Sequence, residues 1–145
     1  MFEKILIPTD GSEFTRDAVN KALELAKSSG GRVTALYVID QTLFVNVPET
    51  TIAKVYAVLK KEGQAAVDKV RDLALSMGVQ ADVMVVDGPP AKTIIDIAKE
   101  HDLVVMGTIG RTGISKLLMG SVADKVIKQS VVPVMVVRSP EVDKK

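Results

Sequence analysis

The sequence predicts an α/β fold in which an open, five-stranded parallel sheet carries helices on both faces. Five short apolar runs are rich in β-branched residues and show little alternation with polar ones, as expected of strands that are covered on both faces. A helical pattern lies between each run and the next, so the expected order is β-α-β-α-β-α-β-α-β. Right-handed crossovers turn such an order into a parallel sheet. The predicted strands are residues 5–7, 33–39, 83–86, 103–106 and 132–137.

Four helices are expected between these strands, at residues 13–28, 51–77, 90–100 and 121–129. The first two patterns each place their apolar side chains on one stripe, which is the face expected to cover the sheet. In the first helix the stripe comprises Phe14, Ala18, Ala22, Leu25 and Ala26. In the second it comprises Ile52, Val55, Tyr56, Leu59, Ala66, Val70, Leu73 and Met77.

The ends of the helices are marked by proline and glycine. Pro89 and Pro90 give the third helix a rigid start, because the missing N–H of proline costs nothing in a first turn. Gly30, Gly31 and Gly78 stand where C-cap glycines close the first two helices.

The second crossover, residues 41–78, holds an apolar loop at residues 43–47 before its helix. A strap packed on the core is the favoured interpretation, because long loops in compact domains usually serve packing or function. A lid and a partner surface are the alternatives.

Composition limits the classes of function. The 145 residues suit a single domain, residues 1–145. A net charge of +1 and only five aromatic residues without tryptophan argue against a nucleic-acid partner. No apolar run approaches the roughly 20 residues that span a bilayer, so no membrane association is expected. The absence of cysteine excludes disulfides and thiolate metal sites, and together these features predict a cytoplasmic protein.

A glycine-rich loop follows the fourth predicted strand and leads into the last predicted helix. It contains Gly107, Gly110 and Gly113, and it ends at Gly120 and Ser121. Such a loop lets backbone N–H groups approach a phosphate, and the helix start adds unpaired donors and a partial positive charge. The spacing is neither that of a P-loop nor that of the dinucleotide-binding fingerprint. The sequence therefore predicts a nucleotide-binding protein with an unusual phosphate loop.

A structural alternative exists for the start of the last helix. Ser121 and Asp124 match a capping box, in which side chains satisfy the first backbone N–H groups of the helix. Phosphate binding would partly displace that role.

Acidic residues follow the first three predicted strands, as Asp10, Asp40 and Asp87. In open sheets of this kind, ligands bind beyond the carboxyl ends of strands at the point where the strand order reverses. If the chain starts in the centre and returns after the third strand, this point lies between strands one and four. Asp10 then faces the glycine loop, where it could accept hydrogen bonds from a ribose or hold a metal ion that bridges phosphates. Ordinary turn and N-cap chemistry explains Asp10-Gly11-Ser12 equally well.

The chain resembles the universal stress protein family, in particular its ATP-binding branch. That branch carries the pattern Gly-x2-Gly-x9-Gly-Ser/Thr, which is complete here at Gly107, Gly110, Gly120 and Ser121. The opening Lys-Ile-Leu-Ile-Pro-Thr-Asp-Gly-Ser at residues 4–12 and the closing run at 132–137 are also similar. The resemblance implies a Rossmann-like fold, similar to adenine nucleotide alpha hydrolases, with the strand order 3-2-1-4-5. Ile109 departs from the family, which often has a polar side chain there.

The resemblance also implies a nucleotide site. Asp10 would hold the ribose and, through the phosphates, Mg²⁺ or Mn²⁺. Val38 would lie near adenine, which packs in an apolar pocket beside Pro8 and Thr9. The residues expected around ribose and phosphates are Gly107, Gly110, Gly120, Ser121 and Val122, and Met106, Arg111 and Gly113 complete the predicted nucleotide-binding set.

Three functions follow from these residues. The leading one is an ATP-binding regulatory protein of the stress response, a dimeric switch that presents a ligand-dependent surface to a regulatory protein partner not identified by the sequence. The second is a slow ATPase or phosphotransferase, for which Arg111 and Lys116 could stabilise charge but no residue clearly orients the nucleophile. His101 is not expected to catalyse, because the topology places it at the opposite end of the sheet. The third is a nucleotide-free scaffold, which the intact glycine pattern disfavours.

Self-association is expected through the last strand. Residues 132–137, from Val132 to Val137, are apolar on both faces, although the strand should lie at an edge of the sheet. An uncovered edge of this kind invites pairing with another chain, and a two-fold homodimer removes the hazard. The family resemblance implies such dimers.

Overall fold

A computed structural model describes residues 2–108 and 120–139 of the chain. It confirms the predicted sheet, which contains five parallel strands in the order β3-β2-β1-β4-β5. The strands are β1 (Lys4–Pro8), β2 (Arg32–Ile39), β3 (Gln80–Asp87), β4 (Leu103–Gly107) and β5 (Val134–Val137). The helices are α1 (Arg16–Ser29), α2 (Glu49–Ser76), α3 (Pro90–Ala98) and α4 (Ser121–Gln129), with 3-10 turns η1 (Glu13–Thr15) and η2 (Gln41–Phe44).

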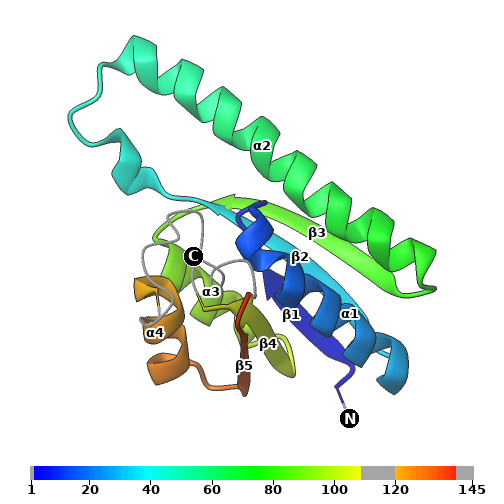
Figure 1. Cartoon of the computed structure of the whole chain (residues 1–145). Helices are drawn as coiled ribbons and strands as arrows, with labels where there is room; N and C mark the ends of the chain where they lie inside the picture. The colour runs from blue at the N-terminus through cyan, green and yellow to red at the C-terminus, as the bar shows by residue number, and fades with distance from the viewer. Residues whose placement is uncertain (1, 109–119, 140–145) are drawn as a thin grey trace.

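The helices form two layers, one on each face of the sheet (Figure 1). Alternate residues of the central strands face opposite layers, which is the period of a β-strand. Ile5 and Ile7 belong to the core cluster that α1 and α2 cover. Leu6 belongs to the cluster beneath α3 and α4. The sheet therefore has two apolar cores, and its central strands are buried on both sides, as their unalternating sequence indicates.

The helix ends confirm the predicted stop and start signals. Gly30 has φ of 72° at the C-cap of α1, and Gly78 has φ of 76° just after α2. Pro90 is the first residue of α3, and Pro89 takes the N-cap position.

Two strands begin two or more residues away from their predicted starts, whereas the starts of the other three agree within one residue. β3 begins at Gln80 rather than at residue 83. It is an outer strand of the sheet, where polar side chains are tolerated, and Asp82 pairs there with Arg32 of β2 at 2.9 Å. β5 begins at Val134 rather than at Val132, because Pro133 has no N–H to donate to the ladder.

The predicted apolar stripe of α2 is only partly right. The side chains of Ala66 and Val70 are buried as expected, but Val55 is 37% and Leu73 39% exposed. Val67 and Ala74 are buried in their place. Small residues bring this part of α2 close to the sheet, so larger side chains at the margin of the stripe are left outside. In α1, Val19 and Leu23 are buried, while Leu25 is half-buried.

The loop at residues 43–47 packs on the core only in part, so the favoured strap is confirmed for Phe44 alone. Phe44 packs against the core that α1 and α2 cover. Val45 is 66% exposed, so it does not serve packing. No helix within the described ranges is long and apolar enough to cross a bilayer.

Candidate functional site

The candidate site lies at the edge where the strands end, between β1 and β4. These strands are neighbours in the sheet, yet β1 leads into α1 on one face and β4 leads towards α4 on the other (Figure 1). This is the reversal point at which open α/β sheets bind ligands. The predicted juxtaposition of the two strand ends is therefore confirmed.

The start of α4 is joined directly to the end of β4. The N–H of Gly120 donates to the carbonyl oxygen of Thr108 at 2.7 Å, and the N–H of Thr108 donates to Val137 at 3.3 Å. The sequence did not indicate Thr108, because this residue contributes through its backbone N–H and carbonyl oxygen, which do not depend on the type of side chain. The two described ends of the glycine-rich segment thus meet at the site, whereas Gly110, Arg111 and Gly113 lie outside the described residues.

The capping box predicted at this helix is wrong. Gly120, with ψ of 154°, is the N-cap, so Ser121 is already the first helical residue. Asp124 lies too far along the helix to reach back, and its carboxylate pairs with Lys128 at 3.1 Å instead. The first N–H groups of a helix have no acceptor within the helix. At this helix start, those of Ser121 and Val122 point out of an N-terminus with a partial positive charge, which suits an anion.

The acidic turn after β1 is built by side-chain hydrogen bonds to the backbone. Asp10 accepts from the N–H of Ser12 at 2.9 Å through Oδ1, and Thr9 accepts from the N–H of Gly11 at 3.1 Å through Oγ1. Gly11 has φ of 79°, a left-handed conformation that glycine adopts without strain. The turn chemistry considered for Asp10 is therefore present, and the ribose and metal roles of this residue remain predictions.

A pair of hydroxyl groups also stabilises the turn. Thr9 Oγ1 and Thr15 Oγ1 lie 3.1 Å apart, and both residues are buried. Ser12 Oγ is also buried, and it finds no hydrogen-bond partner among the residues that the structure describes. The hydrogen bonds of Thr9, Asp10 and Thr15 thus fix the conformation of the turn.

Three of the residues expected near the nucleotide share one apolar cluster. Met106 belongs to the core beneath α3 and α4, and Val38 and Val122 pack against it. They come from the ends of β4 and β2 and from the start of α4. Pro8, the last residue of β1, is buried. Thr9 donates its N–H to the carbonyl oxygen of Leu36 at 2.9 Å, which ties this turn to β2. The structure therefore brings Val38, Met106 and Val122 together beside the strand ends.

The other two acids at this edge have structural partners. Asp40 caps η2 by accepting from the N–H of Thr42 at 3.0 Å and from its hydroxyl at 2.6 Å. Asp87 accepts the hydroxyl hydrogen bond of Tyr56, with both carboxylate oxygens 2.9 Å away. This contact to Asp87 raises the pKa of Tyr56. Within the described ranges, no three His, Cys, Asp or Glu side chains gather in a way that could hold a metal ion.

His101 lies at the opposite edge, where the strands begin. Its Nδ1 is 2.9 Å from the carbonyl oxygen of Ile97, and its Nε2 is 3.0 Å from the hydroxyl of Thr34. A carbonyl oxygen only accepts, so Nδ1 carries a hydrogen. His101 thus joins the turn after α3 to β2, far from the reversal point.

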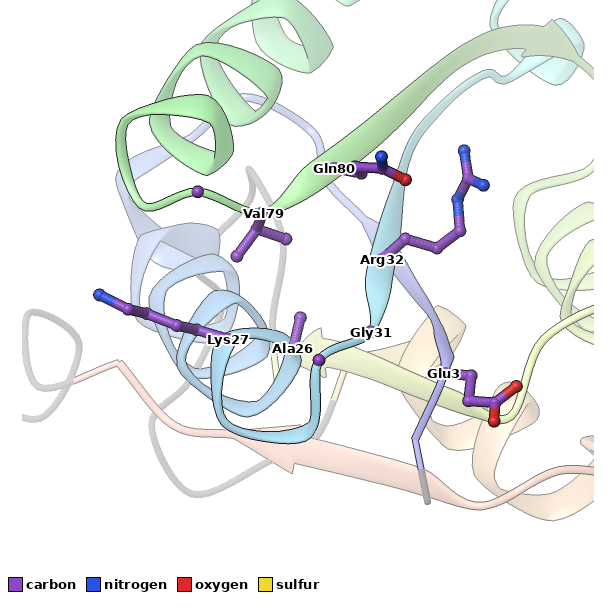
Figure 2. A pocket seen from close by; sticks show the side chains of 9 residues that line it. Glu3, Ala26, Lys27, Gly31, Arg32, Val79 and Gln80 are labelled. Carbon is purple, nitrogen blue, oxygen red and sulfur yellow. The ribbon is translucent and has the colours of Figure 1, made fainter.

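One cavity also lies at the end of the sheet where the strands begin. It measures about 340 Å³ and lies between the ends of α1 and α2. Figure 2 shows Ala26 and Val79 facing each other across it, while Lys27 points away. The second, of about 70 Å³, lies between η1, α1 and α2 beside Ser12 and Lys69. Neither of these two cavities lies between the ends of β1 and β4. Backbone donors and strand topology are what indicate a nucleotide site there.

Comparisons with known proteins agree with this geometry. A sequence model of the universal stress protein family matches residues 1–138. The chain is 42% identical over 144 residues to universal stress protein MJ0531 of Methanocaldococcus jannaschii, which covers 97% of this chain and 85% of that protein. It is 34% identical to universal stress protein YxiE of Bacillus subtilis, over 95% of this chain and 100% of the relative. The solved structure of protein MJ0577 of M. jannaschii superposes with a TM-score of 0.85 at 30% identity, covering 96% and 97% of the two chains.

Proposed function

The chain belongs to the universal stress protein family, and from this premise we propose that it is an ATP-binding regulatory protein. The glycine loop and the start of α4 hold the phosphates, and the nucleotide controls a dimeric switch in the stress response. The switch acts on a regulatory protein partner in the cytoplasm.

One observation carries the phosphate assignment. The 2.7 Å hydrogen bond from Gly120 to Thr108 sets the N-terminus of α4 against the end of β4. A phosphate at this place receives backbone N–H groups and the positive end of the helix dipole. Each hydrogen bond to a charged group contributes about 1.5–3 kcal/mol. Several aligned donors therefore support micromolar binding without a P-loop lysine, and Gly107, Gly110, Arg111 and Gly113 complete this part of the site.

The apolar cluster supports an adenine base. Val38, Met106 and Val122 offer aliphatic surface. In this proposal Pro8 and Thr9 complete the pocket of the base. Two solved structures of the same fold are a universal stress protein in complex with cAMP, at a TM-score of 0.68 and 22% identity, and one in complex with dAMP, at 0.66 and 18%. These relatives support an adenine nucleotide as the class of ligand.

Asp10 takes the ribose in this proposal. Its Oδ1 also accepts from Ser12, so the carboxylate is held in place before the ligand arrives. A divalent ion, Mg²⁺ or Mn²⁺, accompanies the phosphates, and Asp10 is the acid placed to meet it. The ion would neutralise part of the negative charge of the phosphates.

The homodimer is proposed through β5. All four residues of this edge strand are half-buried, and Val131 just before it is 71% exposed. Pairing with the same strand of a second copy would cover this apolar edge strand, which could otherwise pair with other chains and aggregate.

Two other functions remain alternatives. A slow ATPase or phosphotransferase would use Arg111 and Lys116, but a residue that orients the nucleophile is lacking at the described strand ends. At most weak hydrolysis is therefore expected. A nucleotide-free dimeric scaffold would keep the fold and lose the ligand.

Calorimetric titration of ATP with Mg²⁺ tests the proposal, together with mass spectrometry of small molecules released on denaturation. We expect ATP to copurify or to bind, and Ser121→Glu to weaken binding at least about a hundredfold, because a carboxylate then competes with the phosphates for the same donors. The fold is kept, since an acid in the first turn favours the helix.

Gln129→Glu is the matched control, because it adds the same charge at the other end of α4. Gly110→Val offers a second test within the loop. Wild-type affinity in Ser121→Glu would contradict the phosphate assignment. The absence of any bound nucleotide would favour the scaffold.

A further inference from the structure

One apolar side chain of α2 stays exposed although it lies in the part of the helix that packs on the sheet. Leu73 is 39% exposed, whereas Val70, one turn earlier, is buried. Both residues line the cavity of about 70 Å³ between η1, α1 and α2, together with Val19 of α1. Side chains that face a gap lose the contacts that close packing supplies. A ligand with an aliphatic part would therefore restore these contacts.

Hydroxyl groups also line this cavity, and they differ in their hydrogen bonds. Thr15 donates its hydroxyl hydrogen to the carbonyl oxygen of Ser12 at 3.0 Å. The hydroxyl of Thr9, which lies 3.1 Å from that of Thr15, therefore donates to Thr15, since a hydroxyl group has a single hydrogen. Ser12 Oγ is buried and has no hydrogen-bond partner among the described residues. Ser12 is thus the residue of this turn whose hydroxyl hydrogen can be donated to a ligand.

The open side of the cavity carries positive charge. Arg16, Asn20 and Lys69 line the cavity and are exposed. Lys69 forms no ion pair with another residue in the part of the chain that the structure describes. None of the described residues that line the cavity is Asp or Glu. Together with Ser12, these side chains offer hydrogen-bond donors and positive charge, which is the environment that an anion requires.

We infer that this cavity binds a small aliphatic carboxylate of about three or four carbons. A water molecule needs about 10–15 Å³ of such a cavity, so this one holds roughly five to seven heavy atoms. The carboxylate accepts from Ser12 and meets the positive charge, while the aliphatic tail covers Val70 and Leu73. Inorganic phosphate would leave the aliphatic wall uncovered, and an amine would be repelled by Arg16 and Lys69.

The cavity is separate from the proposed nucleotide site. It lies on the face of the sheet that α1 and α2 cover, whereas α4, whose start is proposed to hold the phosphates, lies on the opposite face. The inference therefore goes beyond the proposed function and does not depend on it. Its test needs no nucleotide.

NMR titration of the whole isotope-labelled protein without ATP tests the inference. The probe is butyrate, and butyramide has the same tail without the charge. We expect butyrate to shift the backbone amide signals of Ser12 and Lys69 until they saturate, and to bind at least about tenfold more tightly than butyramide. Butyrate should also bind at least about fivefold more tightly than acetate, because its longer tail removes more apolar surface from water.

Two variants with matched controls test the two parts of the cavity. Lys69→Gln should weaken butyrate binding at least about threefold, since a positive charge is lost. Lys61→Gln should bind butyrate like the wild type, because Lys61 is an exposed lysine of the same helix outside the cavity lining. Leu73→Asn should reduce the preference for butyrate over acetate to about twofold or less. Leu75→Asn should keep that preference, because Leu75 is 62% exposed and lies outside the lining.

Several results would overturn the inference. Circular dichroism first establishes that Lys69→Gln and Leu73→Asn are folded. Amide signals of Ser12 and Lys69 that do not respond to butyrate would exclude the cavity as its site. Binding of butyramide or inorganic phosphate as tight as that of butyrate would contradict the proposed ligand class, as would unchanged affinity in Lys69→Gln. Loss of butyrate binding in Ser121→Glu would show that the carboxylate occupies the start of α4 instead.

Discussion

The side of the sheet where the strands begin and the side where they end use the same kinds of polar residue in different ways. Where the strands begin, polar groups satisfy one another. Asp102 accepts from the N–H groups of Glu3 and Lys4 at 2.9 and 3.0 Å, and Ser29 donates its hydroxyl hydrogen to the carbonyl oxygen of Phe2 at 2.8 Å. Where the strands end, the hydroxyl of Ser12 has no hydrogen-bond partner among the described residues, and the first N–H groups of α4 have no acceptor within the helix.

This difference teaches that a cavity alone does not identify the ligand site. The cavity of about 340 Å³ lies at the edge where polar groups are already paired. It exists because two helices end there at left-handed glycines, Gly30 and Gly78, which place no side chain in the gap. We therefore expect substitutions at this edge to change stability and leave nucleotide affinity unchanged, whereas Ser121→Glu should do the reverse.

The largest effect is expected from Gly31→Ala. A Cβ at Gly31 would collide with the carbonyl oxygen of Phe2 and lie 3.0 Å from that of Glu3, so the backbone must move. Overpacking of this kind costs about 3 kcal/mol of unfolding free energy. Urea denaturation should show the loss, and calorimetry should show unchanged ATP binding.

Gly30→Ala is its control, because a Cβ there meets nothing within 4 Å. Only the left-handed backbone is then strained, at about 1 kcal/mol. If the two variants were equally stable, close packing at Gly31 would not be the reason for the glycine.

Much of the fold could be predicted because each strand carries its own signal. The unalternating runs indicated buried parallel strands, and glycine and proline marked the helix ends. Which residues of α2 would be buried could not be predicted in the same way. Periodicity reports which side of a helix is apolar, but not how far the sheet extends beneath it. Val55 belongs to the apolar stripe and is exposed, because it lies in the part of α2 before Gly63, where no residue of the helix is fully buried.

The candidate site was predictable where it depends on topology. Asp10 and Gly107 follow strands whose order sets them side by side, so their placement at one edge is confirmed. The capping box failed because Gly120 takes the extended cap conformation, a matter of one residue of helix register. The Tyr56–Asp87 contact was missed although both residues were noted separately, because a long-range pair leaves no local pattern.

A smaller loss of stability is expected from His101→Ala. The variant removes both hydrogen bonds of the imidazole and leaves the hydroxyl of Thr34, which is 9% exposed, without its partner. An unsatisfied buried polar group costs about 1–2 kcal/mol. Glu100→Ala, an exposed neighbour in the same turn, should be neutral in urea denaturation. Loss of ATP binding in His101→Ala at unchanged stability would contradict the division between the two edges.

The smallest effect, and the one that depends on pH, is expected from Asp102→Asn. The hydrogen bonds from the backbone of Lys4 and Glu3 hold the pKa of Asp102 below its usual value of 3.8. A carboxylate with a lowered pKa stabilises the fold above the pKa of the unfolded chain, and this contribution is lost as pH falls through the folded value. At pH 7 the variant should therefore melt at a slightly lower temperature than the wild type, since the amide oxygen accepts the same hydrogen bonds less strongly. Below about pH 4 the two melting temperatures should converge, because protonation removes the charge from Asp102 itself. Calorimetric melting at a series of pH values measures this convergence. If the difference in melting temperature between the wild type and Asp102→Asn stayed constant down to acid pH, the charge of the carboxylate would play no part in fixing the start of β1.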